Sequence, residues 1–212
     1  MYRSQDIDRL EPPFPALTPA QRYHLEVNGY VVVEGVLGQE EVDSYHDALQ
    51  RLKREFFTTD DPWNATIRHC TIFGRIQAWA GPKVQFDNYL EAHPVFLDYV
   101  AHPRIVGMAQ EVVGNQVRLV ETQAIINSRN PDGDDGTERA ERPVWHHLRP
   151  GSWSYTENGL FHCNFVKALT NLTDLGPDDG GTRVIAGSHK LGCAEEDIVA
   201  AAREDLSLVH QV

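Results

Sequence analysis

The order of its hydrophobic patterns most constrains how this chain of 212 residues can fold. Helical patterns dominate the first half, and β-type patterns dominate the second. The clearest helical pattern runs from Gln39 to about Phe57, where apolar residues recur at positions 42, 45, 49, 52 and 56. A long amphipathic helix is expected there. Helices followed by strands favour an α+β domain, in which a sheet or barrel is backed by helices.

The first helix is marked by a capping box. Thr18 offers an N-cap hydroxyl, a proline follows it, and Gln21 stands three residues on. This helix should run to about Asn28, where Gly29 supplies its C-terminal stop. The β-branched run Tyr30–Val33 then predicts a short strand.

The remaining elements follow from proline, glycine and β-branched residues. No steady period is visible from Asp60 to Asn88, and the polar run Asn130–Gly136 predicts a loop. The expected elements are helices over 94–102, 103–113 (closed by Gly114) and 195–203, with strands over 116–128, 161–172 and 182–185.

Length and composition favour one globular domain over residues 1–212, with residues 1–15 as a loose lead-in. The chain is 41% hydrophobic and 24% charged, as ordinary globular proteins are. Its formal net charge of -12 gives no global attraction to nucleic acid or to an anionic membrane.

The start of the chain is polar and charged, unlike a signal peptide, and no run approaches the roughly 20 apolar residues of a membrane span. The three cysteines, Cys70, Cys163 and Cys193, lie far apart. An odd count without a signal peptide indicates reduced thiols and a cytoplasmic protein.

The most informative run extends from Gly176 to Lys190. Physically it is a tight turn, a short buried strand and a second glycine turn, and an ordinary hairpin accounts for such a pattern. Its residue types nevertheless resemble the central signature of the phytanoyl-CoA dioxygenase family. The matching residues are Leu172-Thr173-Asp174-Leu175, Asp179-Gly180-Gly181 and Val184-Ile185-Ala186-Gly187-Ser188-His189-Lys190.

The N-terminal part is similar to the same family through residues 17–21, the run Asn28–Val33 and the helix from Gln39. The resemblance implies a double-stranded β-helix, a cupin-like jelly-roll backed by the N-terminal helices. It further implies Fe(II) held by two histidines and one carboxylate, with 2-oxoglutarate as cosubstrate, O₂ and a small-molecule substrate. In the family the residue matching His189 is a structural signature and not an iron ligand.

The family's first ligands lie in a Trp-His-x-Asp run, and this chain has Trp145-His146-His147-Leu148. His146 matches the first metal ligand. Leu148 stands at the carboxylate position, and an aliphatic side chain cannot bind a metal. If His147 is taken as the ligand instead, Arg149 stands at the carboxylate position, and its positive charge suits a metal even less than Leu148 does.

Three explanations of Leu148 are open. The carboxylate could come from Glu157 or from the acidic loop Asp132–Asp135. The site could dispense with it, as related halogenases do to leave room for chloride, although they use a small residue. Otherwise the metal site has decayed. His147 or His162 could also enter the metal's ligand set.

The family's distal histidine, and the arginine that pairs with 2-oxoglutarate, follow well after the signature. His210 comes too soon after it to be that ligand. We therefore expect the closing strands of the barrel to be missing, which leaves the chain marginally stable alone or paired with a partner.

For contacts to 2-oxoglutarate the sequence offers Gln123, on the strand before the His146 motif. Gln123 could equally be an ordinary glutamine on the solvent-facing side of that strand. Trp153, Tyr155 and Asn158 are candidates for the substrate border, or for ordinary loop packing.

Three function hypotheses result. The first is an Fe(II)/2-oxoglutarate dioxygenase that hydroxylates a small molecule, with an incomplete site in this chain. The second is a non-catalytic member of the fold that binds a small molecule or a partner. The third is a cupin-type metal module built on His146, His147 and His162.

Overall fold

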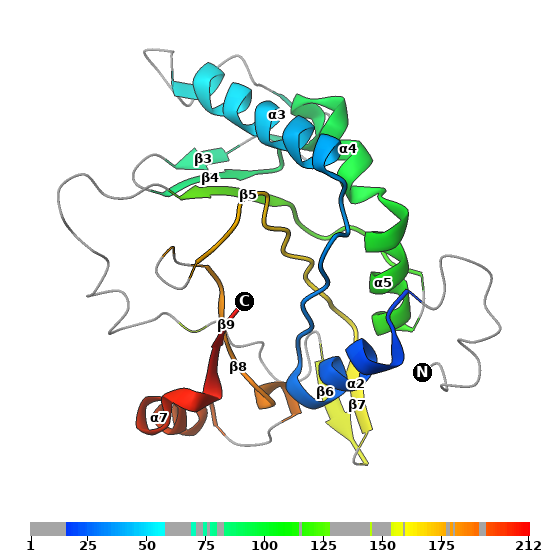
Figure 1. Cartoon of the computed structure of the whole chain (residues 1–212), viewed down its shortest axis with the longest axis vertical. Helices are drawn as coiled ribbons and strands as arrows, with labels where there is room; N and C mark the ends of the chain where they lie inside the picture. Colours follow the sequence, from blue (N-terminus) through cyan, green and yellow to red (C-terminus); the bar gives the residue numbers. More distant parts are fainter. Residues whose placement is uncertain are drawn as a thin grey trace. The chain divides into compact units, whose positions relative to one another are not determined.

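A computed structural model describes residues 16–57, 69–70, 74–75, 77–79, 83–114, 116–127, 145, 154–158, 160–176, 179, 181–190 and 194–212 (Figure 1). The chain divides into two compact units. The first unit comprises Met1–Val36, Pro103–Val117 and Trp145–Val212, and the second comprises Leu37–His102 and Arg118–Val144. The expectation of one domain over 1–212 stays a prediction.

Helix α2 (Pro19–Asn28) of the first unit has the predicted bounds. The amide of Gln21 donates to the Thr18 hydroxyl over 3.2 Å, and the amide of Thr18 donates to the Gln21 side chain over 2.9 Å. Gly29 ends the helix at φ 81°, a left-handed conformation that glycine adopts without steric cost, and its amide donates to Leu25. The capping-box prediction is confirmed in both directions.

Helix α5 (Pro103–Val113) also belongs to the first unit, with the predicted bounds, and it is followed by Gly114 at φ 76°. Its residue Glu111 is buried. The Glu111 carboxylate accepts hydrogen bonds from the amides of Ala16 and Leu17 and forms an ion pair with Arg22. One buried carboxylate thus fixes the segment that leads into α2.

The second unit is built on a three-stranded antiparallel sheet, in the order β3 (Gln77–Trp79), β4 (Lys83–Asp87), β5 (Gln123–Asn127). Helices α3 (Gln39–Phe57) and α4 (Pro94–Val100) lie along one side of it (Figure 1). Phe86 and Leu90 are fully buried at the centre of the core, which also contains Ala48, Leu52, Val84, Tyr89, Phe96 and Ala124. The long amphipathic helix is confirmed with its predicted bounds. The second unit also contains the 3-10 helix η1 (Leu90–Ala92) and the hairpin of β1 (His69–Cys70) and β2 (Gly74–Arg75).

Two further strand pairs belong to the first unit. Strand β6 (Ser154–Glu157) pairs with β7 (Leu160–Cys163), and β8 (Arg183–Ile185) pairs with β9 (Val209–Gln211), all antiparallel. Between β8 and β9 lie η2 (Ser188–Lys190), α7 (Glu195–Glu204) and η3 (Leu206–Leu208). The strand at 182–185 and the helix from Glu195 are therefore confirmed.

The strand predicted over 30–33 is wrong, because these residues carry no strand. Two other strand predictions are wrong in extent: of 116–127 only β5 is a strand, residue 128 lying outside the described residues, and 161–172 shortens to β7. Exposed apolar side chains mark the lost parts: Val32 is 58% exposed, Val120 49% and Leu169 58%. A segment with high strand propensity forms a strand only where a neighbouring strand supplies ladder partners and other parts of the protein cover its apolar face. The alternative reading of the run Gly176–Lys190 as an ordinary hairpin is not supported, because β8 pairs with the distant β9.

The mixture of helices and strands is confirmed. The described strands form four small sheets, so the jelly-roll and the missing closing strands stay predictions. None of the helices within the described ranges has the length and apolar character that crossing a membrane requires. The loop predicted over Asn130–Gly136 lies outside those ranges.

Candidate functional site

The two faces of strand β5 differ sharply in burial. Ala124 is 7% exposed in the core of the second unit, and Ile126 packs against that core. Gln123 and Ile125 alternate with them and are exposed, Ile125 by 46%. Because side chains of a strand point alternately to opposite faces, Gln123 and Ile125 share the face that the core does not use.

Strand β4 contributes two more polar groups to this open face. Asp87 lies opposite Gln123 in the ladder, and Gln85 lies opposite Ile125. The Gln85 amide donates to the Asp87 carboxylate over 3.2 Å, and both side chains are half-buried. Side chains directly opposite in a ladder lie about 5 Å apart at Cβ, so Asp87 is a neighbour of Gln123. This open face therefore presents two amides and one carboxylate.

Asp87 and Gln85 were not predicted as site residues from the sequence. The signal was present, because residues 83–87 alternate polar and apolar side chains, as a half-buried strand does. The alternating pattern covers only the five residues 83–87, and the residues around it show no steady period.

The predicted metal motif is described by the structure only at Trp145. His146, His147 and Leu148 lie outside the described residues, as do Asp132–Asp135 and Trp153. Trp145, directly before His146, is half-buried. The backbone of Tyr155 and Glu157 lies on β6, and Asn158 is exposed at the following turn with φ 52°.

The β6–β7 hairpin carries His162 and Cys163 on adjacent positions of β7. The Cys163 thiol donates to the carbonyl of Phe165 over 3.2 Å. Burial raises the pKa of this thiol, and the nearby Glu26 carboxylate adds to the rise. A raised pKa makes the reactive thiolate of Cys163 scarcer at neutral pH.

The signature residues after β8 pack against α2 of the same unit. Gly187 takes φ 76°, and its amide donates to Asn28 over 2.9 Å. The Ser188 hydroxyl donates to Ile185 over 2.7 Å, which closes the turn. His189 and Lys190 both contact the carbonyl of Glu26. The structure therefore gives the signature a local packing role.

The donor set fits an iron site only in part. Two histidines and a carboxylate are the donors of a non-haem Fe(II) centre, and the motif supplies His146 but has Leu148 in the carboxylate's place. Within the described ranges, no three His, Cys, Asp or Glu side chains gather closely enough to hold a metal ion. Of the positions in the family's Trp-His-x-Asp run, this chain fills the histidine with His146 and has Leu148 at the carboxylate.

Comparison with known proteins extends the resemblance over most of the chain. The family model described as phytanoyl-CoA dioxygenase matches residues 25–205. No solved structure matches.

Three similar curated proteins bear the name ectoine dioxygenase. The protein of Streptomyces avermitilis is 27% identical over 184 residues, covering 84% of this chain and 54% of the relative. The protein of Streptomyces coelicolor is 26% identical over 176 residues, covering 80% and 51%. The protein of Nocardia farcinica is 27% identical over 191 residues, covering 87% and 55%. The chain thus spans about half the length of these relatives. On the family match over residues 25–205, the chain belongs to the phytanoyl-CoA dioxygenase family.

Proposed function

We propose that the protein is an Fe(II)- and 2-oxoglutarate-dependent dioxygenase that hydroxylates a small molecule with O₂. The observation that carries the proposal is the family match over residues 25–205, which includes both the Trp145-His146 pair and the signature. When bound, the iron would supply the oxidation chemistry, and the protein would supply ligands, orientation and shelter from water. A jelly-roll fold and a cytoplasmic location remain parts of this proposal.

Two residues of this chain have assigned roles in the proposal. His146 is the metal ligand, because it holds the histidine position of the family's Trp-His-x-Asp run. Gln123 contacts the cosubstrate, because it lies on the face of the sheet that the core leaves open, and an amide can donate to a carboxylate. Asp87 stands beside it and would orient the Gln123 amide or a polar substrate group.

A second candidate function is favoured by Leu148. A chain without the carboxylate ligand could bind a small molecule, or a partner, on the same fold without turnover. Both candidates use the open face of β4 and β5. They differ in whether iron binds and whether 2-oxoglutarate is consumed.

Ectoine is the first substrate to try, because three similar proteins carry its name. At 26–27% identity this is a starting point for a panel of small polar molecules. The open face fits such a panel, since Gln123, Gln85 and Asp87 all offer hydrogen-bonding groups.

The test adds 2-oxoglutarate anaerobically to the iron(II)-treated protein and follows the visible absorption of the chelated cosubstrate. O₂ is then admitted with ectoine, and 2-oxoglutarate consumption is measured. Gln123→Ala should raise the 2-oxoglutarate concentration needed for half-saturation about tenfold, as loss of a hydrogen bond to a charged group predicts. Gln50→Ala, on helix α3, is the matched control and should change nothing.

Leu148→Asp separates the two candidates. If the site is an oxygenase site weakened by Leu148, restoring the carboxylate should tighten iron binding and increase 2-oxoglutarate consumption. Absorption and consumption absent from both the wild type and Leu148→Asp would reject the oxygenase proposal and leave the binding function.

A further inference from the structure

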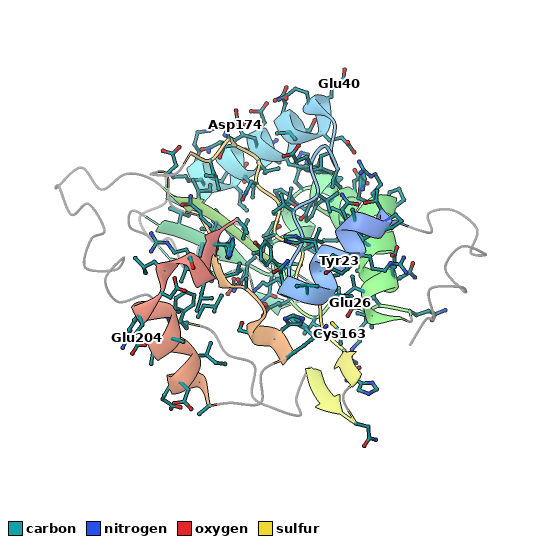
Figure 2. All side chains as sticks on the ribbon, turned by 60° about the horizontal axis from the view of Figure 1, so that its bottom comes forward. Tyr23, Glu26, Glu40, Cys163, Asp174 and Glu204 are labelled. Carbon is teal, nitrogen blue, oxygen red and sulfur yellow. The ribbon has the colours of Figure 1, made fainter. Side chains whose placement is uncertain are left out.

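Asp87 carries a charge that is partly withdrawn from water on the open face of β4 and β5. Its side chain is half-buried, whereas acidic side chains of helix α3, such as Glu40 and Asp43, are exposed. Figure 2 labels Glu40, which points away from its helix into solvent. Withdrawing a carboxylate from water is costly unless the carboxylate gains hydrogen bonds or an opposite charge. A half-buried carboxylate on this face is therefore expected to bind a partner.

The partners of Asp87 within the described residues use only part of its carboxylate. The Gln85 amide donates to one carboxylate oxygen over 3.2 Å. No basic side chain in the described ranges pairs with Asp87. A carboxylate offers about four acceptor positions on its two oxygens. As far as the described residues go, acceptor positions on Asp87 therefore remain for a donor that comes from outside the chain.

The neighbours of Asp87 suit a small molecule that has both N–H groups and an apolar body. Gln123 lies directly opposite Asp87 in the ladder. Ile125, which is 46% exposed, lies opposite Gln85 and offers apolar contact. Opposite side chains lie about 5 Å apart at Cβ, and side chains two residues apart on one strand lie about 7 Å apart. A molecule the size of one substituted six-membered ring spans these distances.

The charge of Asp87 indicates the class of molecule. Hydrogen bonds from a cation to a carboxylate are roughly twice as strong as neutral ones, and a planar amidinium or guanidinium group can donate two at once. A carboxylate repels anions, so Asp87 disfavours an anionic substrate and also the carboxylates of 2-oxoglutarate at its own position. Gln123 is thus left for the cosubstrate, and Asp87 serves the substrate.

We propose that Asp87 determines which substrates bind: it receives a small molecule through a positively charged nitrogen group, an amidinium or an ammonium, while Gln85 holds the carboxylate in place. The inference rests on the proposed function in one respect, namely that the open face receives the substrate, which both candidate functions share. The formal net charge of -12 adds to the attraction of such a molecule. This recognition requires neither iron nor 2-oxoglutarate.

The test uses three probes of nearly the same shape that differ in charge: benzamidinium, benzamide and benzoate. Nuclear magnetic resonance of the 212-residue chain without added iron follows the side-chain amides of Gln85 and Gln123 and the carboxylate carbon of Asp87. Benzamidinium should shift these signals and bind at least about tenfold more tightly than benzamide, as charge-assisted hydrogen bonds predict. Benzoate should bind more weakly than either.

Asp87→Asn removes the charge but keeps the size of the side chain and an oxygen that accepts from Gln85. It should lower the affinity for benzamidinium about tenfold and leave the affinity for benzamide unchanged, so that the charge preference disappears. Asp43→Asn is the matched control, because Asp43 also accepts from a glutamine side chain, that of Gln39, over 2.8 Å. It changes the net charge equally and should bind all three probes as the wild type does.

A measurement on the wild type keeps the proposal testable if Asp87→Asn does not fold. Nuclear Overhauser effects should connect the ring protons of bound benzamidinium to the Ile125 methyl groups and to the Gln85 side-chain amide. Equal affinities for the three probes, tighter binding of benzoate, or contacts confined to other residues would overturn the proposal. So would a preference for benzamidinium that persists in folded Asp87→Asn.

These outcomes are distinct from those of the iron and 2-oxoglutarate test. Binding that favours benzamidinium, without the absorption of chelated 2-oxoglutarate, would reject the oxygenase and keep the cation preference for the binding function. Absorption of chelated 2-oxoglutarate without a preference for benzamidinium would reject the role of Asp87 alone.

Discussion

Nδ1 of His189 lies 2.5 Å from the position that a Cβ would take on Gly29, although 160 residues separate them in sequence. Gly29 also has φ 81°, which an L side chain rarely adopts. Position 29 therefore requires glycine for two reasons: the helix ends there in a left-handed conformation, and His189 occupies the space that a Cβ would need. The N-terminal and central motifs of the chain meet at this contact.

The first prediction separates these two demands. Gly29→Ala should lower the free energy of unfolding by about 2 kcal/mol or more, because conformational strain of about 1–2 kcal/mol adds to a steric clash with His189. Gly35→Ala is the matched control, with φ 61° and nothing within 4 Å of its Cβ position. It should cost only the strain. Urea unfolding measures both, and equal losses would show that the His189 contact does not constrain Gly29.

The second prediction concerns Glu111, whose carboxylate serves two amides and Arg22. Glu111→Gln should lower the free energy of unfolding by about 2–3 kcal/mol, because buried hydrogen bonds to a charged acceptor are lost. Arg51→Gln removes an exposed ion pair with Glu55 and should cost at most about 0.5 kcal/mol. Urea unfolding again provides the measurement. A Glu111→Gln loss as small as that of Arg51→Gln would mean that the N-terminal segment does not depend on Glu111.

The helices were the most predictable part of the fold. Their ends carry local signals: the Thr18–Gln21 capping box, the prolines that open α4 and α5, and the glycines after α2 and α5. Because a helix end depends on residues close to it in sequence, its position can be predicted from those residues.

Strands were less predictable, because their extent depends on distant partners. The apolar residues of 116–122 suit a strand, yet the ladder with β4 reaches only from Gln123 to Asn127. The pairing of Val184 with His210 could not be read from either segment alone. At the candidate site, Gln123 was identified from its place before the motif, whereas its neighbour Asp87 required the register of β4 against β5.

The third prediction tests the core of the second unit. Phe86 is fully buried, so Phe86→Ala should lower the free energy of unfolding by about 3–5 kcal/mol through lost burial and a cavity. Ile125→Ala, on the neighbouring strand but 46% exposed, should cost less than half as much. Urea unfolding followed by circular dichroism compares the two variants. Similar losses would indicate that the open face of β5 is covered in solution.

The fourth prediction concerns Cys163. Burial raises the pKa of its thiol, so the reactive thiolate is scarcer than in a free cysteine at the same pH. In a Cys70→Ser, Cys193→Ser background, alkylation by iodoacetamide at pH 8 should be severalfold slower in the folded chain than in urea. The rate should rise as the pH rises, since the thiol then ionises. Equal rates in folded and unfolded chains would contradict the protected thiol.

The most direct test of the functional account is anaerobic iron(II) binding by the wild type and by His146→Ala, with His162→Ala as the matched control. The account predicts stoichiometric binding by the wild type, at least a tenfold loss of affinity in His146→Ala, and wild-type affinity in His162→Ala. Loss of binding in His162→Ala as well would favour the three-histidine module. Absent binding in the wild type, or binding unchanged by His146→Ala, would contradict the assignment of His146 as the metal ligand.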